Sequence, residues 1–337
     1  WPPPATSCGR MSPAASVDTA RAALALFGLG NRARLELMRY GENTTYRVHA
    51  ERRSFALRLA RPGYHTAAGV ASELAWMESL RQRGITTPAA VAGADGELAQ
   101  HVALGDGSTQ LAVAFEWVDG VPLSQVQALD PWNRLGALMA EVHQHAEGWS
   151  PPPGFARPAW DLDALVGDRP RWGTPVPDGV WSASDRRVLL SARGAVAERV
   201  GLFGTEPERF GLIHTDLGFE NVLVQADGSA VVIDFDDCGP SWYLYDIASV
   251  LYPLEGSPGF ESRRDALTAG YRTRRQLPED ELAELPTFLM CRRLVTLGWT
   301  FSRPDTGHAR RQRPRRLATS PAAARRFLQW HADHPPR

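Results

Sequence analysis

Residues 213–237 read IHTDLGFENVLVQADGSAVVIDFDD, and they decide how the rest of the chain is interpreted. Aliphatic runs at 222–224 and 230–233 flank Asp227 and Gly228. An Asp-Gly pair between such runs predicts a β-hairpin, because a two-residue type I′ turn needs positive φ at both central positions. The sequence therefore predicts a hairpin whose turn is centred on this pair.

The predicted turn also determines which polar residues face each other. A turn centred on Asp227 and Gly228 places Asn221 opposite Asp234. Directly opposed side chains leave the same face of a sheet with Cβ atoms about 5 Å apart. An amide oxygen and a carboxylate would then meet at the open end of the hairpin, where both could bind one hard cation. Asp216 precedes Asn221 by five residues and could reach the same place.

The composition is that of a soluble globular protein. A length of 337 residues is enough for two lobes, and the net charge of −1 creates no field that would attract nucleic acid or a membrane. Neither is expected as a partner, and a monomer or homodimer is expected. The chain contains no lysine, so any phosphate contact must come from Arg, His or backbone. The three cysteines show no C-x-x-C spacing, which fits the cytoplasm.

The first part of the chain predicts a sheet-rich lobe at 16–117, after a disordered leader at 1–15. Strands are predicted at 35–47 (a pair joined by a tight loop at 41–44), 55–59, 98–104 and 111–118. Helices are predicted at 22–29, with Asp18 as N-cap, and at 71–83. Arg58 lies on the third strand and Glu73 in the first turn of the second helix, so the two can pair across this lobe.

The remainder predicts a mainly helical lobe at 118–305 that carries the hairpin. Helices are predicted from Asp130 as N-cap, and at 184–202, 245–254, 263–274 and 279–301. Residues 148–184 are rich in Pro and Gly but contain four tryptophans, which predicts an ordered irregular insertion. His143 is expected at the surface near a helix C-terminus. Residues 306–337 are expected to form a solvated basic tail, with five arginines at 310–316.

The polar residues around the hairpin favour phosphoryl transfer. That reaction requires positioning and charge neutralisation more than covalent chemistry. Mg²⁺ uses few protein ligands and completes its shell with phosphate oxygens and water, which suits Asn221 and Asp234. A carboxylate beside the metal, such as that of Asp216, can accept the proton of a substrate hydroxyl.

The segments IHTDLGFEN and VVIDFDD together resemble the signature of the aminoglycoside phosphotransferase and choline kinase-like family, which is related to the protein kinases. The resemblance covers roughly residues 20–305. It implies an α+β, bilobal, protein-kinase-like fold, with a small antiparallel sheet lobe and a hinge at 115–120. It also implies a kinase that transfers the γ-phosphate of ATP, with Mg²⁺, to a hydroxyl of an aminoglycoside, amino alcohol or sugar-like molecule.

The resemblance also assigns roles to individual residues. It makes Asp216 the catalytic base and Asn221 and Asp234 the Mg²⁺ ligands, while His214 braces the catalytic loop and Asp246 is a buried structural residue. In the first lobe, it implies nucleotide-binding positions in the loop over the phosphates, at the phosphate-contacting cation with its helix partner, and at the adenine hinge. These positions are Gly41, Asn43, Thr44, Arg58, Glu73, Phe115, Glu116 and Trp117.

This chain departs from the family pattern at two places. Arg58 stands where the family usually has Lys, and an arginine is planar, bulkier and always charged. It could still bind the α- and β-phosphates through two parallel hydrogen bonds. The loop at 41–45 reads GENTT rather than G-x-G-x-x-G.

The sequence leaves two other functions and the acceptor open. A protein serine/threonine kinase of the same fold is one alternative, and a non-catalytic nucleotide-binding regulator is the other. Only the missing lysine supports the regulator. Asp236, Glu220 and Asp161 could together form an acidic pocket suited to a cationic amine.

Overall fold

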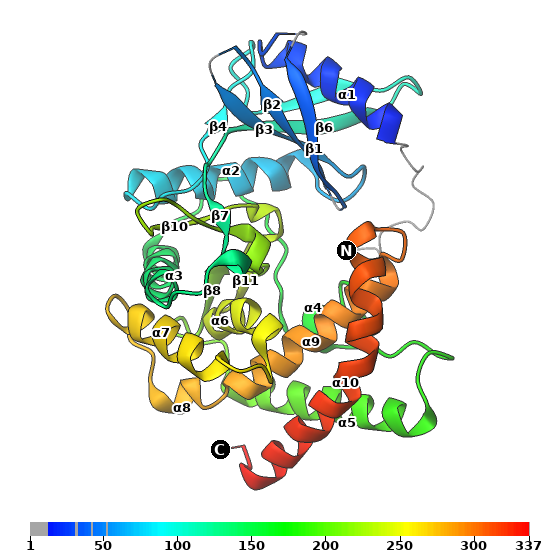
Figure 1. Ribbon diagram of the computed structural model, residues 1–337, viewed down its shortest axis with the longest axis vertical. Coiled ribbons are helices and arrows are strands. Elements are labelled where there is room, and N and C mark those ends of the chain that lie inside the picture. The colour runs from blue at the N-terminus through cyan, green and yellow to red at the C-terminus, as the bar shows by residue number, and fades with distance from the viewer. Residues whose placement is uncertain (1–12, 31–32, 42, 52, 337) are drawn as a thin grey trace. The chain divides into compact units, whose positions relative to one another are not determined.

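The computed structural model describes residues 13–30, 33–41, 43–51 and 53–336, and the chain forms two compact units (Figure 1). The first unit extends to Asp119 and also includes Ser150–Arg157. The second contains Gly120–Trp149 and the chain from Pro158 onward.

The first unit is built on an antiparallel sheet. Within the described residues this sheet has six strands, in the order β1-β2-β3-β6-β4, and β5 pairs with β6 as well. The strands are β1 (Arg34–Tyr40), β2 (Asn43–His49), β3 (Ser54–Ala60), β4 (Ala90–Val91), β5 (Ala99–Ala103) and β6 (Thr109–Glu116). Two helices, α1 (Pro13–Leu26) and α2 (Ala67–Gln82), complete the unit.

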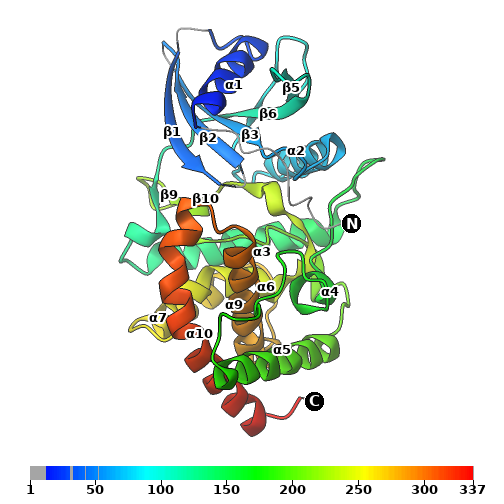
Figure 2. The same cartoon turned by 90° about the vertical axis from the view of Figure 1, so that its right-hand side faces the viewer.

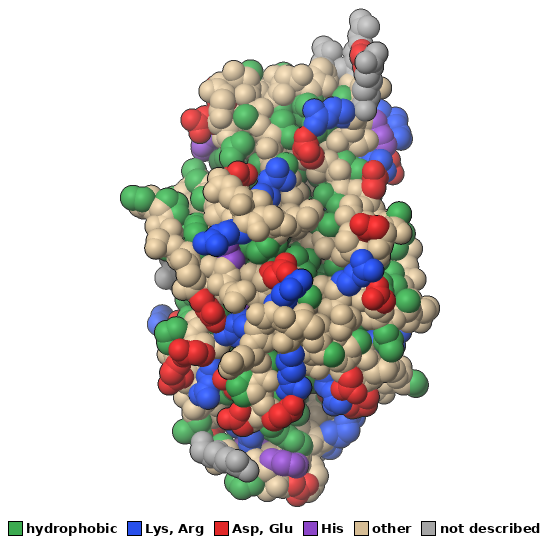
Figure 3. Space-filling view, turned by 90° about the vertical axis from the view of Figure 1, so that its left-hand side faces the viewer, with side chains coloured by type: hydrophobic (Ala, Val, Ile, Leu, Met, Phe, Trp, Pro, Cys, Tyr) green, Lys and Arg blue, Asp and Glu red, His purple; other side chains and the backbone are tan. Residues whose placement is uncertain are grey.

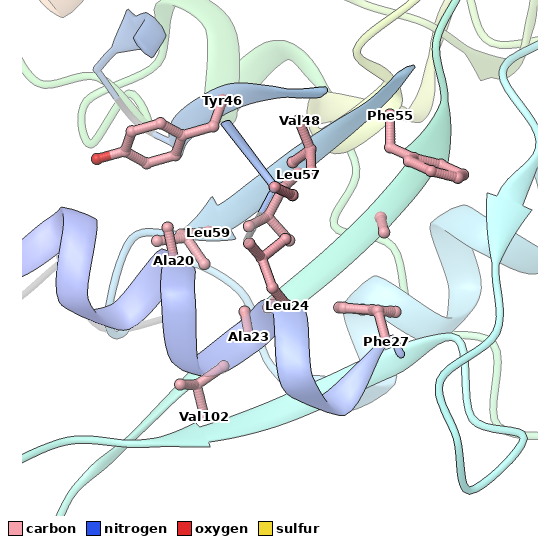
Figure 4. Packing of buried hydrophobic residues seen from close by; sticks show 13 residues of the cluster. Ala20, Ala23, Leu24, Phe27, Tyr46, Val48, Phe55, Leu57, Leu59 and Val102 are labelled. Carbon is pink, nitrogen blue, oxygen red and sulfur yellow. The ribbon is translucent and has the colours of Figure 1, made fainter. Parts of the chain in front are cut away.

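The core of the first unit lies between α1 and one face of the sheet (Figure 4). Leu24 and Phe27 of α1 pack against Val48 of β2 and Leu57 of β3, and all four are buried. Side chains alternate along a strand, so Arg58 points to the opposite face, where α2 lies.

The N-terminal helix begins earlier than predicted. The helix α1 already includes Pro13, so Asp18 lies inside it rather than at its N-cap. Ser16, which was assigned to the first position after the leader, is buried and accepts a hydrogen bond from Tyr46 of β2 at 2.9 Å. The predicted leader at 1–15 is therefore wrong for 13–15, and residues 1–12 lie outside the described residues.

The second unit is mainly helical. Its longer helices are α3 (Asp130–Gly148), α5 (Ala183–Phe203), α6 (Tyr243–Leu251), α7 (Phe260–Arg272), α9 (Leu285–Ser302) and α10 (Gly307–Asp333). Short helical elements are η1 (Leu123–Gln125), α4 (Leu162–Val166), η2 (Phe219–Asn221), η3 (Phe235–Asp237), η4 (Tyr252–Leu254) and α8 (Glu279–Leu282). The strands are β7 (Val121–Pro122), β8 (Phe210–Ile213), β9 (Val222–Val224), β10 (Ala230–Val232) and β11 (Gly239–Trp242).

The segment expected to be a basic tail is instead the helix α10, which lies along α9 and α5 (Figures 1 and 2). Thr306 caps its N-terminus by accepting the N–H of Ala309 at 3.2 Å. Ala324 and Phe327 are buried along one side. Near its end, Arg199 of α5 donates to the backbone oxygen of His334 at 2.6 Å. The arginine-rich run is thus largely the exposed face of a packed helix.

The hairpin forms, but its register differs from the predicted one by one residue. β9 and β10 pair with Val224 opposite Ala230, instead of opposite Val231. The turn has three residues between Gln225 and Ser229, because only Gly228 has positive φ, at 79°. This is the three-residue turn with glycine in the left-handed region, which adds one residue to the loop and shifts every facing pair.

The insertion predicted at 148–184 is divided between the two units. In the first unit, the N–H of Ala156 donates to Ser72 Oγ of α2 at 2.8 Å. In the second, Trp160 donates its indole N–H to the backbone oxygen of Asp237 at 2.8 Å, and its backbone N–H to Pro240 O at 2.8 Å. The part from Pro158 onward is thereby tied to the segment that follows the hairpin.

The distribution of charged side chains on the surface is consistent with a net charge close to zero. Acidic and basic side chains are interspersed on the face shown in Figure 3. Among the described residues, no helix combines the length and apolar character needed to cross a bilayer.

Helices α3 and α7 approach each other closely through two glycines. A Cβ atom on Gly136 would lie 1.9 Å from Leu267 O, and one on Gly270 would lie 1.8 Å from Asn133 O. Both distances are far below contact, so these positions require glycine. Asp130 was expected to cap α3 but lies in its first turn, where its carboxylate accepts from Arg134 Nε at 2.7 Å.

We expect Gly136→Ala to lower the free energy of unfolding by about 2 kcal/mol or more, because the added methyl overpacks the contact between α3 and α7. Gly194 of α5 is the matched control, because a methyl group added there would meet no neighbouring atom within 4 Å. Gly194→Ala should be neutral or stabilise by about 0.5–1 kcal/mol through helix propensity. Urea unfolding of the two variants checks this, and equal midpoints would contradict it.

Candidate active site

The carboxylate of Asp246, on α6, anchors the backbone just before Asp216. It is fully buried and accepts the N–H of His214 at 2.9 Å and that of Thr215 at 2.7 Å. Thr215 has a φ of 69°, in the left-handed region that a β-branched residue rarely adopts. The two hydrogen bonds hold this unfavourable conformation, which is typical of residues at functional sites. The predicted burial of Asp246 is confirmed.

His143 completes the anchor, although we expected it at the surface. It is fully buried; its Nε2 lies 3.3 Å from Asp246 Oδ2, and its Nδ1 lies 2.9 Å from the hydroxyl of Tyr271. Burial lowers the pKa of His143, and the neighbouring Asp246 opposes this effect only in part. The ring is therefore neutral at pH 7, donates from Nε2 to the carboxylate and accepts from Tyr271 at Nδ1.

His214 joins the loop to the end of the hairpin. The N–H of Asp216 donates to His214 Nδ1 at 3.3 Å, so the ring proton is on Nε2, which donates to Ile233 O at 3.0 Å. The ring also packs against Phe235, with centroids 4.7 Å apart. This arrangement fits the bracing role that the family resemblance implies for His214.

Asn221 lies directly beside Asp216. Its Nδ2 donates to the backbone oxygen of Asp216 at 2.9 Å and to Asp216 Oδ2 at 3.2 Å. Both partners are acceptors only, so the amide nitrogen must face them, and Oδ1 of Asn221 is turned away from them. That oxygen is a suitable ligand for a hard cation.

Asp234 is not opposite Asn221, and this prediction was wrong. With the observed register, Asn221 pairs with Ile233, whose N–H donates to Asn221 O at 2.9 Å. Strand β10 ends at Val232, and Asp234 has a φ of 67° and a ψ of 62°. The left-handed conformation ends the alternation of the strand and turns the chain into η3, so ordinary pairing geometry does not determine the direction of the carboxylate.

The chemistry of the donor set fits Mg²⁺ better than a transition metal. An amide oxygen and a carboxylate are hard oxygen ligands, and Mg²⁺ in phosphoryl-transfer sites is bound by one or two such groups together with substrate phosphates. Over the described residues, no group of three or more His, Cys, Asp or Glu side chains is placed to hold a metal ion.

Arg292 is a site residue that the sequence analysis missed. It lies on α9, with 12% of its side chain exposed, and its Nη2 donates to Asp216 Oδ1. Its Nη1 lies 3.3 Å from Thr215 O and 3.4 Å from the hydroxyl of Tyr245. A signal was present in the sequence: adjacent arginines interrupt an otherwise apolar run in α9, and a buried arginine requires a partner.

In the first unit, Arg58 and Glu73 form the expected pair. Both terminal nitrogens of the guanidinium donate to the two carboxylate oxygens at 2.7 Å, in a bidentate arrangement, and both side chains are buried. Arg58 also lies 5.3 Å from the ring centre of Phe115. Glu73 is in the second turn of α2, since the helix begins at Ala67, four residues before the predicted start.

At the proposed adenine hinge, two backbone N–H groups already donate to other parts of the chain. The N–H of Glu116 donates to Ala89 O at 2.8 Å, and the N–H of Trp117 donates to Ser54 O at 3.2 Å. These two groups cannot also donate to a base, which leaves carbonyl oxygens at these positions. The indole of Trp117 donates to Asp119 Oδ1 at 3.0 Å.

The loop expected over the phosphates is shorter than predicted. Strand β2 begins at Asn43, so Asn43 and Thr44 are strand residues, and both are buried. The N–H of Gly41 donates to Asn43 O at 3.0 Å and closes the turn.

The three acids proposed for the acceptor lie at different elements of the second unit. Asp161 caps α4 by accepting the N–H of Ala164 at 2.9 Å, and it lines a hollow of about 690 Å³ that contains neither Glu220 nor Asp236. Glu220 is exposed and accepts from Ser124 Oγ at 3.2 Å, whereas Asp236 is buried. A shared acidic pocket therefore stays a prediction.

Comparison with known proteins identifies the family. A model described as the phosphotransferase enzyme family matches residues 40–286. The chain belongs to this family.

Members of the phosphotransferase enzyme family with named activities are similar to this chain over most of its length. A solved microcompartment-associated aminopropanol kinase is 34% identical, with a TM-score of 0.85, over 93% of this chain and 98% of that one. Homoserine kinase from Sinorhizobium medicae is 27% identical over 73% of this chain and 71% of its own. An amicoumacin kinase solved with AMP-PNP and Ca²⁺ is 20% identical, with a TM-score of 0.75, over 91% and 93%.

These matches confirm the predicted family, the bilobal kinase-like fold and the prediction of a kinase that acts on a small-molecule hydroxyl.

The neutral His143 predicts a pH dependence of stability. Its pKa is lowered in the folded state, so between that value and the unfolded value of about 6.5 the unfolded chain binds more protons than the native one. The contribution of neutral His143 to the free energy of unfolding is fully present above about pH 6.5. It falls as the pH decreases through this window, by at most about 1.4 kcal/mol per pH unit.

We expect His143→Gln to flatten this dependence, whereas the same change at the exposed His101 should leave it as in the wild type. Urea unfolding at a series of pH values from about 7.5 to 5 measures the difference. Parallel curves for the wild type and His143→Gln would contradict a buried, neutral imidazole.

Proposed function

We propose that this enzyme transfers the γ-phosphate of ATP, with Mg²⁺, to the hydroxyl of a small amino alcohol. The observation that carries the chemistry is the arrangement at Asp216. Its carboxylate is held by Asn221 and Arg292, and 32% of its side chain remains exposed, so a hydroxyl can approach. A carboxylate fixed in this way is suited to orient a nucleophile and accept its proton.

The residues of the second unit then have distinct tasks. The acceptor hydroxyl donates a hydrogen bond to Asp216, and its oxygen attacks the γ-phosphorus. The bond from that phosphorus to the oxygen bridging to the β-phosphate breaks, ADP leaves, and the hydroxyl proton passes to Asp216 and then to water. Asp246, His143 and His214 act earlier, because they hold the backbone that carries Asp216.

Asn221 and Asp234 would hold the metal ion. When bound, Mg²⁺ would neutralise charge on the phosphates and bridge them to the protein. The amicoumacin kinase structure with AMP-PNP and Ca²⁺ supports the use of a nucleotide and a divalent ion in this fold. In the first unit, Arg58 is the candidate for phosphate contact.

The acceptor class rests on the aminopropanol kinase. That protein is 34% identical and matches this chain almost from end to end. The homoserine kinase relative also acts on a small molecule that bears both an amine and a primary hydroxyl. Both names support a compact amino alcohol over an aminoglycoside or a sugar.

Replacing the base provides the first test. We expect Asp216→Asn to lower kcat by about 10³-fold while the affinity for ATP stays within about threefold, since proton acceptance is lost and the nucleotide site is untouched. Asp168→Asn, an exposed acid-to-amide change, is the control. Turnover by Asp216→Asn close to that of the wild type would remove Asp216 from the mechanism.

A panel of acceptors provides the second test. With Mg-ATP, we expect aminopropanols to give values of kcat/KM at least about 10²-fold above those for a hexose or an aminoglycoside, because a site that pairs with an amine rejects ligands that lack it or exceed its size. ADP formation and phosphate incorporation are measured together. A preference for the larger acceptors, or labelling of the protein itself as the main product, would contradict the proposed class.

A further inference from the structure

We propose that Arg292 is a positioning residue for the reaction, which fixes the carboxylate of Asp216 in the orientation that receives the acceptor hydroxyl. The inference rests on the proposed role of Asp216 as the base. It assigns to α9 a function in catalysis beyond packing.

The two oxygens of Asp216 are held from different directions. Oδ1 accepts from Arg292 Nη2, and Oδ2 accepts from Asn221 Nδ2 at 3.2 Å. A carboxylate bound at one oxygen only can still rotate about its terminal bond, where the rotamer wells are broad. Bonds at both oxygens determine its plane, so the lone pairs that remain on Oδ2 point in one direction.

Arg292 is itself fixed to the loop that it orients. Its Nη1 donates to Thr215 O at 3.3 Å, so one guanidinium group contacts both the carboxylate and the backbone of the residue before it. The hydroxyl of Tyr245 lies 3.4 Å from the same nitrogen. Burial acts to lower the pKa of Arg292, but the nearby oxygens of Tyr245 and Asp216 outweigh it, and the net shift is upward. The guanidinium is therefore a permanent, rigid donor at this place.

Stability alone does not account for this pair. Arg292 gives up most of its hydration, whereas a third of the Asp216 side chain remains in contact with solvent. Because solvent reaches Asp216 and screens its charge, this pair adds less to the free energy of unfolding than a pair buried on both sides would. The arrangement is explained if the main effect of Arg292 is to fix the direction of the Asp216 carboxylate, rather than to stabilise the fold.

Arg293 is a matched control in the next position of the same helix. It is buried as well, and its Nη2 donates to Glu255 Oε2 at 2.6 Å. Glu255 follows η4 and has no role in the proposed reaction. The two arginines therefore have the same side chain, the same helix and a carboxylate partner each, but only one partner is the base.

The experiment compares Arg292→Met, Arg292→Lys and Arg293→Met. We expect Arg292→Met to lower kcat by about 100-fold with KM for ATP within about threefold, because a misdirected reacting group costs about this much. Arg292→Lys should recover about tenfold of that loss, since one donor at Oδ1 is restored. Arg293→Met should keep kcat within about threefold of the wild type.

Thermal unfolding of all three variants separates positioning from folding. Both methionine variants should lose stability, and only Arg292→Met should also lose kcat when it is assayed well below its unfolding temperature. Unchanged kcat in Arg292→Met, an equal loss of kcat in both methionine variants, or no recovery in Arg292→Lys would overturn the proposal.

The readout is ADP formation from Mg-ATP, measured with 1-amino-2-propanol and with water as the only acceptor. Absence of stimulation by the amino alcohol in the wild type would count against the proposed acceptor, not against Arg292. The slow transfer to water still depends on how Asp216 is directed, so the comparison of variants holds in either case.

Discussion

The active site depends on one buried carboxylate. Asp246 has no solvent contact, and a buried charge is costly unless hydrogen bonds compensate for it. The compensation comes from two consecutive backbone N–H groups and from neutral His143. Those N–H groups can both reach the carboxylate because Thr215 adopts a left-handed conformation. The hydrogen bonds to Asp246 therefore hold Thr215 in its strained conformation, and that conformation directs both N–H groups at the buried carboxylate. Together they determine the direction in which the chain enters Asp216.

The parts of this site that the sequence predicted are those that lie close together in the chain. His214, Asp216 and Asn221 fall within eight residues, so spacing and a family signature suffice to group them. His143 and Arg292 were missed because their partners are 103 and 76 residues away. A histidine near a helix C-terminus looks the same in sequence whether it faces solvent or a buried acid, and only the packing of α3 against α7 decides between them.

The hairpin was predicted correctly, but its register was not. The strands lie where the aliphatic runs predicted them, but a turn of three residues replaced the predicted turn of two. A shift of one residue moves every side chain of a strand to the other face. In the observed register Asn221 faces Ile233, and Asp234 lies beyond the end of β10. The left-handed conformation of Asp234 ends the strand, and no pairing rule could have predicted it.

Each unit contains a buried arginine that holds a carboxylate, and the two arginines use their donors differently. Arg58 donates from both terminal nitrogens to the same acid, so the pair Arg58–Glu73 joins β3 to α2. Arg292 divides its donors between Asp216 and the backbone of Thr215. A lysine could supply the charge in either place, but its single nitrogen cannot present two donors in one plane. In a chain without lysine, the planar fork of arginine thus couples the direction of the Asp216 carboxylate to the strained loop that Asp246 holds.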